Sequence, residues 1–207
     1  MIAAWTGAQV RAAEEPFLER GEGNALMRRA AHGLALECAR RLGQGRGRVG
    51  GARVVVLAGT GNNGGDGLWA GAELARRGAS VLAVAVGDRL HPGGADALAA
   101  AGDRVLRPGD DAALVDRAVA AVLAADLVLD AVLGTGARGG LRGTAERIVR
   151  TVLEQWPAAG APVVVACDIP SGVCPDTGAV SGPVLPADVT VAFAGAKAGQ
   201  LLLPGDR

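Results

Sequence analysis

The residues GTGNNGGDGL at 59–68 join an apolar run, ARVVVLAG, to the helical pattern GGDGLWAGAELARRG at 64–78. The apolar run is typical of a buried strand. Gly59, Gly61 and Gly64 form a GxGxxG pattern in the strand-to-helix turn, a context that favours a phosphate site at the helix N-terminus. Glycine also serves any tight turn of this kind, so the pattern alone leaves both interpretations open. Two asparagines and an aspartate among these glycines favour a binding loop, because turn chemistry explains three such residues poorly.

Strand and helix patterns alternate along the rest of the chain. Apolar strands are expected at 52–59, 80–87, 126–134, 162–169 and 188–195, and helices at 6–20, 24–42, 64–78, 93–101, 111–124 and 142–156. Near-continuous apolar strands between helices predict a parallel sheet covered on both faces. We therefore expect an α/β fold, a Rossmann-like three-layer α/β/α sandwich with a mostly parallel sheet and N-terminal helices. The Gly/Arg segment 43–51 is expected to be a loop.

Composition narrows the class of protein. The 207 residues predict one domain, and the balance of 21 basic and 21 acidic side chains argues against a nucleic-acid partner. The sequence has no apolar run of about 18 residues, which predicts no membrane-spanning helix. It begins without the basic and apolar regions of a signal peptide. Three cysteines without metal-type spacing fit a reducing compartment, so we expect a cytoplasmic protein.

Three loops rich in glycine and polar residues follow three of the predicted strands. They read GTGNNGGDG, GTGARGGLRG and DIPSGVCPDTG. Because ligands of such sheets bind beyond the carboxyl ends of the strands, we expect all three loops to form one site. Asp130 lies just before the second loop, and Asp168 and Ser171 lie in the third. Arg138, in the second loop, is a candidate partner for a phosphate.

Asn63, Asp130 and Ser171 offer only oxygen: an amide carbonyl, one carboxylate and one hydroxyl. A transition metal would favour His or Cys ligands, and Mg²⁺ or Ca²⁺ would draw more carboxylates. One carboxylate with neutral oxygens balances a large monovalent cation. The three residues therefore predict a K⁺ site.

The motifs NNGGDG, DAVLGTGARGGLRG, DIPSGVCPDTG and ADVTVAFAGAKAGQLLLPG occur in this order, and together they resemble the NAD(P)H-hydrate epimerase family, the YjeF N-terminal domain. The resemblance covers nearly the whole chain. It implies interconversion of the R and S forms of hydrated NADH and NADPH (NADHX and NADPHX) at nicotinamide C6. It also implies a functional partner, an NAD(P)H-hydrate dehydratase that accepts only the S form.

The resemblance assigns roles to individual positions. Substrate contacts are implied at Asn62, Asn63, Gly64, Gly65, Asp66, Gly134, Thr135, Gly136, Ala137, Arg138, Gly139, Gly140 and Asp168. The ligands of one K⁺ per subunit are implied at Asn63, Asp130 and Ser171, the set that oxygen chemistry also favours. Asp168 is expected to be the catalytic acid or base, ahead of Asp66 and Lys197.

The resemblance also bears on organisation. Residues 1–207 are expected to form a single domain of this family that is truncated at its C-terminus, because the family usually continues into another strand after the residues LLLPGDR. Many relatives are fused to the dehydratase, so the resemblance is also compatible with this chain being one half of a bifunctional enzyme. The resemblance is compatible with a homodimer as well.

Two other functions remain open from the sequence. An NAD(P)-dependent dehydrogenase would use the GxGxxG turn and Asp88 after the second strand, but no His or Tyr is well placed for hydride transfer. A catalytically silent nucleotide-binding or interaction protein of the same fold is the other. The presence of Asn63, Asp130, Asp168 and Ser171 argues against this third interpretation.

Overall fold

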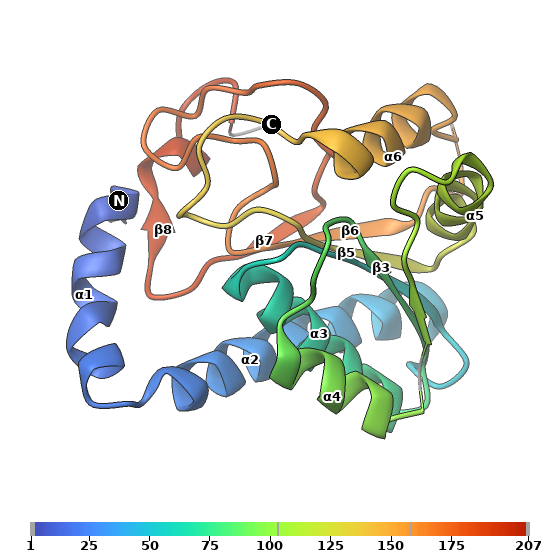
Figure 1. Ribbon diagram of the computed structural model, residues 1–207, viewed down its shortest axis with the longest axis horizontal. Helices are drawn as coiled ribbons and strands as arrows, with labels where there is room; N and C mark the ends of the chain where they lie inside the picture. The colour runs from blue at the N-terminus through green and yellow to red at the C-terminus, as the bar shows by residue number, and fades with distance from the viewer. Residues whose placement is uncertain (1–2, 103, 158, 206–207) are drawn as a thin grey trace.

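The computed structural model describes residues 3–102, 104–157 and 159–205, and it forms three layers around one sheet (Figure 1). The sheet has six strands in the order β4-β3-β2-β5-β6-β7, and every neighbouring pair is parallel. These strands are β2 (Arg53–Ala58), β3 (Ser80–Ala85), β4 (Arg104–Leu106), β5 (Leu127–Ala131), β6 (Val163–Cys167) and β7 (Val189–Val191). The predicted parallel α/β sandwich is confirmed.

Five helices cover the two faces of the sheet (Figure 1). One face carries α2 (Gly23–Arg46), α3 (Asn62–Arg76) and α4 (Pro92–Ala100), and the other carries α5 (Ala112–Leu123) and α6 (Gly143–Glu154). Alternation along the strands separates the two cores: Val54 and Val56 pack with the first set of helices, and Val55 and Leu57 with the second. Ala, Val and Leu build most of both cores.

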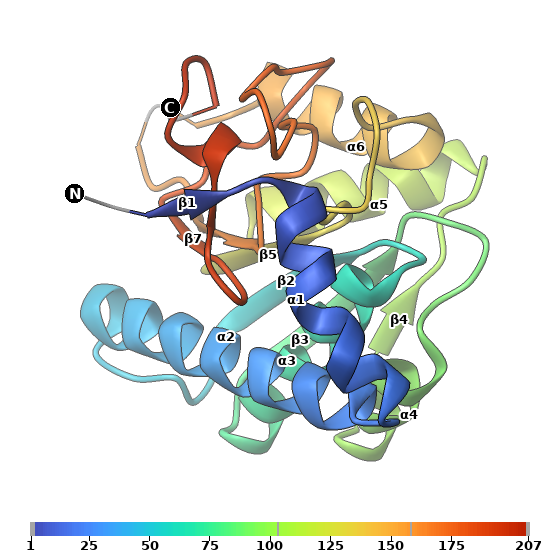
Figure 2. The same ribbon diagram turned by 90° about the vertical axis from the view of Figure 1, so that its left-hand side faces the viewer.

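The helix α1 (Gly7–Glu19) lies to one side of this sandwich (Figure 1 and Figure 2). Among its residues, Gly7 and Val10 are buried, and most of the others are exposed. Before it, β1 (Ala4–Trp5) pairs in parallel with β8 (Ala196–Lys197), which leads into the short 3₁₀ helix η1 (Ala198–Gln200). Two polar contacts also hold α1: the Gly7 amide donates to Asp176 at 2.7 Å, and Arg11 donates to the Thr135 carbonyl at 3.0 Å.

The structure corrects several predicted boundaries. The first glycine-rich stretch is not a loop as far as residue 64, because α3 already begins at Asn62. The predicted loop 43–51 is helical up to Arg46, where Gly47 ends α2 in a left-handed conformation with φ of 75°. Strands β1, β4 and β8 were not expected, and the strand predicted at 188–195 covers Val189–Val191 alone.

None of the described helices combines the length and the apolar character that crossing a bilayer requires.

Candidate active site

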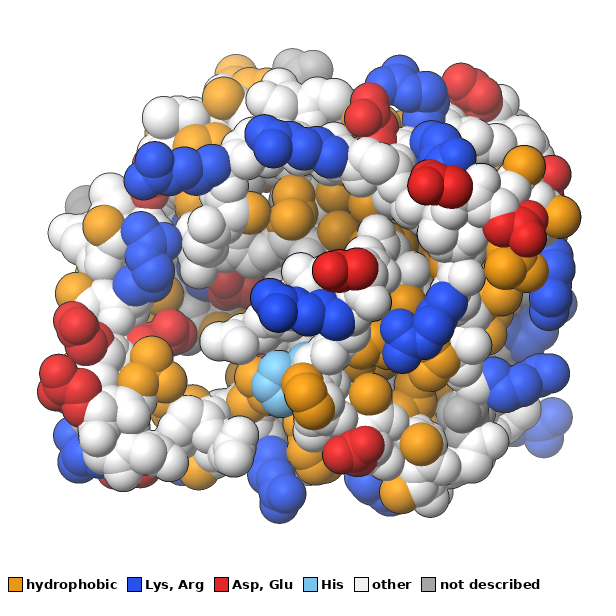
Figure 3. Space-filling model, in the orientation of Figure 1, with side chains coloured by type: hydrophobic (Ala, Val, Ile, Leu, Met, Phe, Trp, Pro, Cys, Tyr) orange, Lys and Arg blue, Asp and Glu red, His pale blue; other side chains and the backbone are white. Residues whose placement is uncertain are grey.

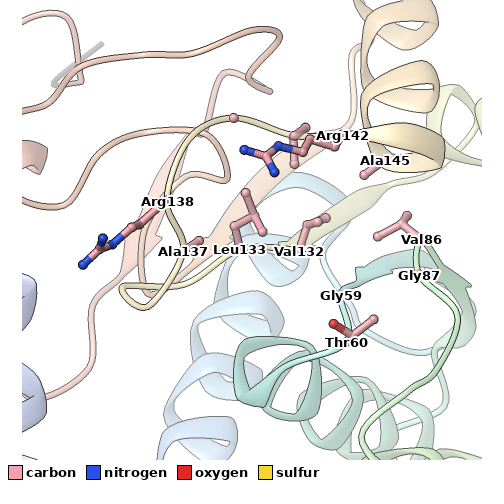
Figure 4. Close-up of a pocket in the computed structure, with 12 residues that line it drawn as sticks. Gly59, Thr60, Val86, Gly87, Val132, Leu133, Ala137, Arg138, Arg142 and Ala145 are labelled. Carbon is pink, nitrogen blue, oxygen red and sulfur yellow. The ribbon is translucent and has the colours of Figure 1, made fainter.

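The connections of the sheet change direction between β2 and β5. The chain moves outward from β2 through β3 to β4, then returns to β5 and moves the other way through β6 to β7. A cavity of about 320 Å³ lies beyond the carboxyl ends of these strands (Figure 4). Thr60 before α3, Val86 and Gly87 after β3, and Arg142 and Ala145 at the start of α6 line it. Its place at the reversal of strand order is where open α/β sheets bind their ligands.

The N-termini of α3 and α6 border this cavity, and both leave backbone N–H groups without partners inside their helices. Neither helix has a side-chain cap at its first residue. Such N–H groups together with the helix dipole favour an anion. The cavity therefore suits a phosphate-bearing ligand, as the GxGxxG turn predicts.

Close approach, rather than turn geometry alone, explains two of the three glycines of that turn. A Cβ on Gly59 would overlap the backbone of Val132, and a Cβ on Gly64 would overlap the carbonyl of Gly59. Gly61 has open space around it. The glycines at 59 and 64 thus let α3 begin directly against the sheet.

A second cavity of about 700 Å³ lies between the loop after β5 and the loop after β6. Residues 133–139 form one wall and also separate this cavity from the first one, since Leu133, Ala137 and Arg138 line both. The opposite wall includes Pro170 and Asp176, and Arg11 of α1 closes one side. The predicted loops thus meet at one edge of the sheet.

Asn63, Asp130 and Ser171 lie around the first residues of the 133–139 loop. The Ser171 hydroxyl donates to the Asp130 carboxylate at 2.6 Å and accepts from the Leu133 amide at 2.9 Å. The side chain of Asn63 packs against Gly134, where an added Cβ would lie 3.2 Å from its Oδ1. Asp130 is the penultimate residue of β5, shortly before the loop, and is 2% exposed.

This oxygen set fits a large monovalent cation. Burial raises the pKa of Asp130 although hydrogen bonds from Ser171 oppose the change, so a nearby positive charge would stabilise its carboxylate. The buried Nδ2 of Asn63 has no hydrogen-bond partner among the described residues, but this group is a donor, so the Oδ1 beside Gly134 is the atom of the amide that would ligate a cation. Within the described residues, no cluster of three His, Cys, Asp or Glu side chains is arranged as a metal site.

Asp168 follows β6 and forms a buried ion pair with Lys197. The Lys197 ammonium group donates to Asp168 Oδ1 and, at 2.8 Å, to the Phe193 carbonyl, and Lys197 is 0% exposed. The Phe193 amide also donates to Oδ1 at 3.0 Å, and Gln200 donates to the Asp168 carbonyl at 2.7 Å. These contacts hold Asp168 at a φ of 66°, a left-handed conformation that is uncommon outside glycine and typical of constrained functional residues.

Two further carboxylates, Asp66 and Glu14, come from two helices and form an acidic group with Asp168. Asp66 is 8% exposed in α3, and its buried Oδ1 has no partner among the described residues. Burial, then the charges of Asp168 and Glu14, raise the pKa of Asp66 to about 8. Burial and the charge of Asp168 likewise raise the pKa of Glu14. Glu14 was not singled out from the sequence, because it belongs to none of the motifs and does not follow a strand.

Other candidates lie outside this cluster. Asn62 and Arg138 are exposed, and the head group of Arg138 points away from Thr60 and Ala145 in Figure 4. His91 caps α4 through a 3.3 Å hydrogen bond from Gly94, and Asp88 is exposed after β3. Thr60, Leu141 and Arg142, which line the first cavity, were not singled out in the sequence.

Residues 23–199 match the family described as YjeF-related protein N-terminus. The chain belongs to this family. A protein of Clavibacter michiganensis subsp. michiganensis named NAD(P)H-hydrate epimerase is 45% identical over 97% of this chain and 84% of its own length. A protein of Mycobacterium tuberculosis named bifunctional NAD(P)H-hydrate repair enzyme Nnr is 44% identical over 91% of this chain and 36% of its own length.

A solved member of the YjeF-related fold gives the structural comparison. The crystal structure of the yeast protein ynu0 has a TM-score of 0.77 and covers 97% of this chain and 84% of its own, at 20% sequence identity. At that identity the comparison supports the fold alone. The family assignment rests on the match over residues 23–199 and on the relatives, and the structural comparison adds the fold.

Proposed function

We propose that this chain is an isomerase, an NAD(P)H-hydrate epimerase that interconverts the R and S forms of hydrated NADH and NADPH. The observation that carries the proposal is the 45% identity to a protein with that name over nearly the whole chain. The site supports it, because Asn63, Asp130, Ser171, Asp66 and Asp168 gather at one edge of the sheet beside two cavities.

The cavities suit the two ends of a dinucleotide. Substrate phosphates would lie near the N-termini of α3 and α6, and residues 134–140 would contact the substrate along the wall between the cavities. The nicotinamide end would reach the acidic group around Asp168. Inversion at C6 requires a bond to that carbon to break and form again, and both steps move protons. Asp168, Asp66 and Lys197 are the candidates for that chemistry.

Asn63, Asp130 and Ser171 would hold one K⁺ per subunit. The ion would offset the buried charge of Asp130 and fix the start of the 133–139 loop against α3. Asn62, Gly64, Gly65 and Asp66, which lie in the first turns of α3, would then present a fixed surface to the substrate.

A coupled assay tests the proposed activity. A mixture of R and S hydrates is supplied with an S-specific dehydratase, and consumption of the R form is followed with and without this protein. Faster loss of the R form supports the epimerase. A second assay tests the dehydrogenase alternative: the protein is mixed with NAD⁺ and common alcohols or hydroxy acids, and absorbance is followed. For that activity, Asp88 would have to contact the ribose. Activity in the second assay alone would overturn the proposal.

The remaining expectations are parts of this proposal. An NAD(P)H-hydrate dehydratase is the functional partner, and the bifunctional relatives support a fused arrangement. A homodimer, a single domain over residues 1–207 and a cytoplasmic location are inferred with it. The free state of Cys38, Cys167 and Cys174 is consistent with a reducing compartment.

A further inference from the structure

Glu14 is a half-buried carboxylate on a helix that is otherwise largely exposed. It lies on the same helical face as Gly7, Val10 and Arg11, because residues three, four and seven positions apart share a face. Val10 is buried, and Gly7 and Arg11 contact the loops after β6 and β5. The inner face of α1 therefore belongs to the active-site edge. Glu15, which follows Glu14, is exposed.

Three carboxylates share one lysine at this edge. The charges that act on Glu14 are those of Asp168, Lys197 and Arg11, and those that act on Asp66 are Asp168 and Glu14. Lys197 is bound directly to Asp168, and Arg11 is the second cation that acts on Glu14, so two cations face three carboxylates. His91 packs against Gly65, the neighbour of Asp66, and the buried thiol of Cys167 lies close enough for Asp66 to raise its pKa.

The two acids that are not bound to Lys197, Glu14 and Asp66, come from different helices. Asp66 is in α3 and Glu14 is in α1, and the space-filling view is open between α1 and the rest of the molecule (Figure 3). Figure 1 shows α1 and the start of α3 on the two sides of this opening. A ring held between them would present one face to each helix.

We propose that Glu14 and Asp66 are the acid–base pair of the epimerisation and that Asp168, paired with Lys197, is a fixed anion beside them. This inference rests on the proposed epimerase function. It differs from the expectation that Asp168 transfers the proton, because Asp168 already accepts from a lysine and from a backbone amide. The buried Oδ1 of Asp66 has no partner among the described residues, so this carboxyl, unlike that of Asp168, is not committed to a protein donor through that oxygen.

The reaction balances with these two groups alone. The protonated acid of the pair gives its proton to the C6 hydroxyl, the C6–O bond breaks and water leaves. The lone pair of nicotinamide N1 forms an N1=C6 double bond, and the ring becomes a cation that the Asp168 carboxylate stabilises. Water then adds to the opposite face of C6, the electron pair returns to N1, and the second carboxylate takes the proton from the added water. The reverse epimerisation uses the two groups in exchanged roles.

The test compares Glu14→Gln and Asp66→Asn with Glu15→Gln as the matched control on the same helix. We expect each of the first two to lower kcat by about a hundredfold or more, the scale of general acid–base loss. The KM should change by less than about threefold, and Glu15→Gln should retain wild-type kinetics. The wild-type pH profile of kcat should show two limbs, and each variant should lose one of them.

The outcomes separate this inference from the proposed function. An inactive wild-type protein overturns the proposed function. An active wild type with Glu14→Gln at more than a third of its kcat, or with both pH limbs retained in that variant, overturns the acid–base pair while the epimerase stands. Because Glu14→Gln could loosen α1, Glu14→Asp provides a second variant. Partial recovery of kcat and of the lost limb supports proton transfer, and no recovery by a variant with wild-type stability overturns it.

Discussion

Ser171 binds both carboxylate oxygens of Asp130. Its hydroxyl donates to Oδ1 at 2.6 Å, and its backbone amide donates to Oδ2 at 2.8 Å. The loop after β6 is thereby tied to a residue inside β5, and through the Leu133 amide to the loop that separates the two cavities. Any ligand that changes the charge at Asp130 therefore acts on both loops.

The proposed K⁺ site gives the first prediction. Asp130→Asn removes the one negative charge among the proposed ligands, so we expect weaker cation binding and lower epimerase activity together. Activity and thermal stability are measured across a KCl series with ionic strength held constant by a bulky organic cation. The wild type should gain in both with K⁺, and the variant should not. Equal K⁺ responses of both proteins would place the ion elsewhere, and Asp96→Asn on α4 serves as the exposed control.

Asp168→Asn should cost stability as well as activity. The substitution is nearly isosteric, but it leaves the fully buried ammonium of Lys197 without its counter-ion. Breaking a buried pair in this way typically costs about 3–5 kcal/mol. Urea denaturation measures the loss, and adding Lys197→Met to the variant should recover most of it. A single variant as stable as the wild type would show that the pair contributes little.

Gly64→Ala and Gly33→Ala should change stability in opposite directions. Both glycines are helical, but a Cβ on Gly64 would overlap the Gly59 carbonyl, whereas nothing lies within 4 Å of one on Gly33. We expect Gly64→Ala to cost about 3 kcal/mol or more, because backbone on both sides cannot move aside easily. Gly33→Ala should stabilise the exposed helix by about 0.5–1 kcal/mol. Chemical denaturation of the two variants compares them, and a tolerated Gly64→Ala would contradict the close approach.

The pKa of Asp66 predicts a pH dependence of stability. Burial and two neighbouring carboxylates raise it from 3.8 to about 8, so the folded protein holds a proton that the unfolded chain has released. The stability from this group is complete below the unfolded value and is lost as the pH rises toward 8. Replacing Asp66 with Asn should remove a slope of up to about 1.4 kcal/mol per pH unit. Urea midpoints between pH 5 and 9 measure it. Asp96→Asn should keep the wild-type slope, and an unchanged slope in Asp66→Asn would contradict the prediction.

Arg138→Ala tests the wall between the cavities. The side chain is exposed and lines both cavities, so we expect it to contact the substrate equally in the ground and transition states. Loss of such binding raises KM more than it lowers kcat. Steady-state kinetics of the variant beside Arg117→Ala, an exposed arginine on α5, measures the difference. A loss confined to kcat would assign Arg138 to the chemical step instead.

Strand ends made much of the site predictable from sequence. The apolar runs fix which residues enter the sheet, and parallel strands bring their carboxyl ends to one edge, so Asp130, Asp168 and Ser171 fall together. Glu14 could not be found in this way. Its position depends on the pairing of β1 with β8, and strands of two residues leave no readable pattern.

The start of α3 shows why the first glycine-rich stretch was misread as a loop. Glycine disfavours helices in isolation, yet here it allows one to pack tightly on the sheet. A Cβ on Gly67 would overlap Ala131, and one on Gly71 would lie 3.2 Å from Val56. Tertiary packing therefore outweighs local propensity, and Asn63 and Asp66 become buried helix residues instead of loop residues.

The pairing of β1 with β8 has a consequence for synthesis of the protein. Ala4 and Trp5 leave the ribosome long before their partners Ala196 and Lys197, which follow all six strands of the main sheet in the sequence. At roughly 5–20 residues per second, α1 waits on the order of ten seconds or more before this pairing can form. The nascent chain can build β2 to β6 in that time, and the helix that carries Glu14 docks last. The acidic cluster is thus completed only after Ala196 and Lys197 have been made.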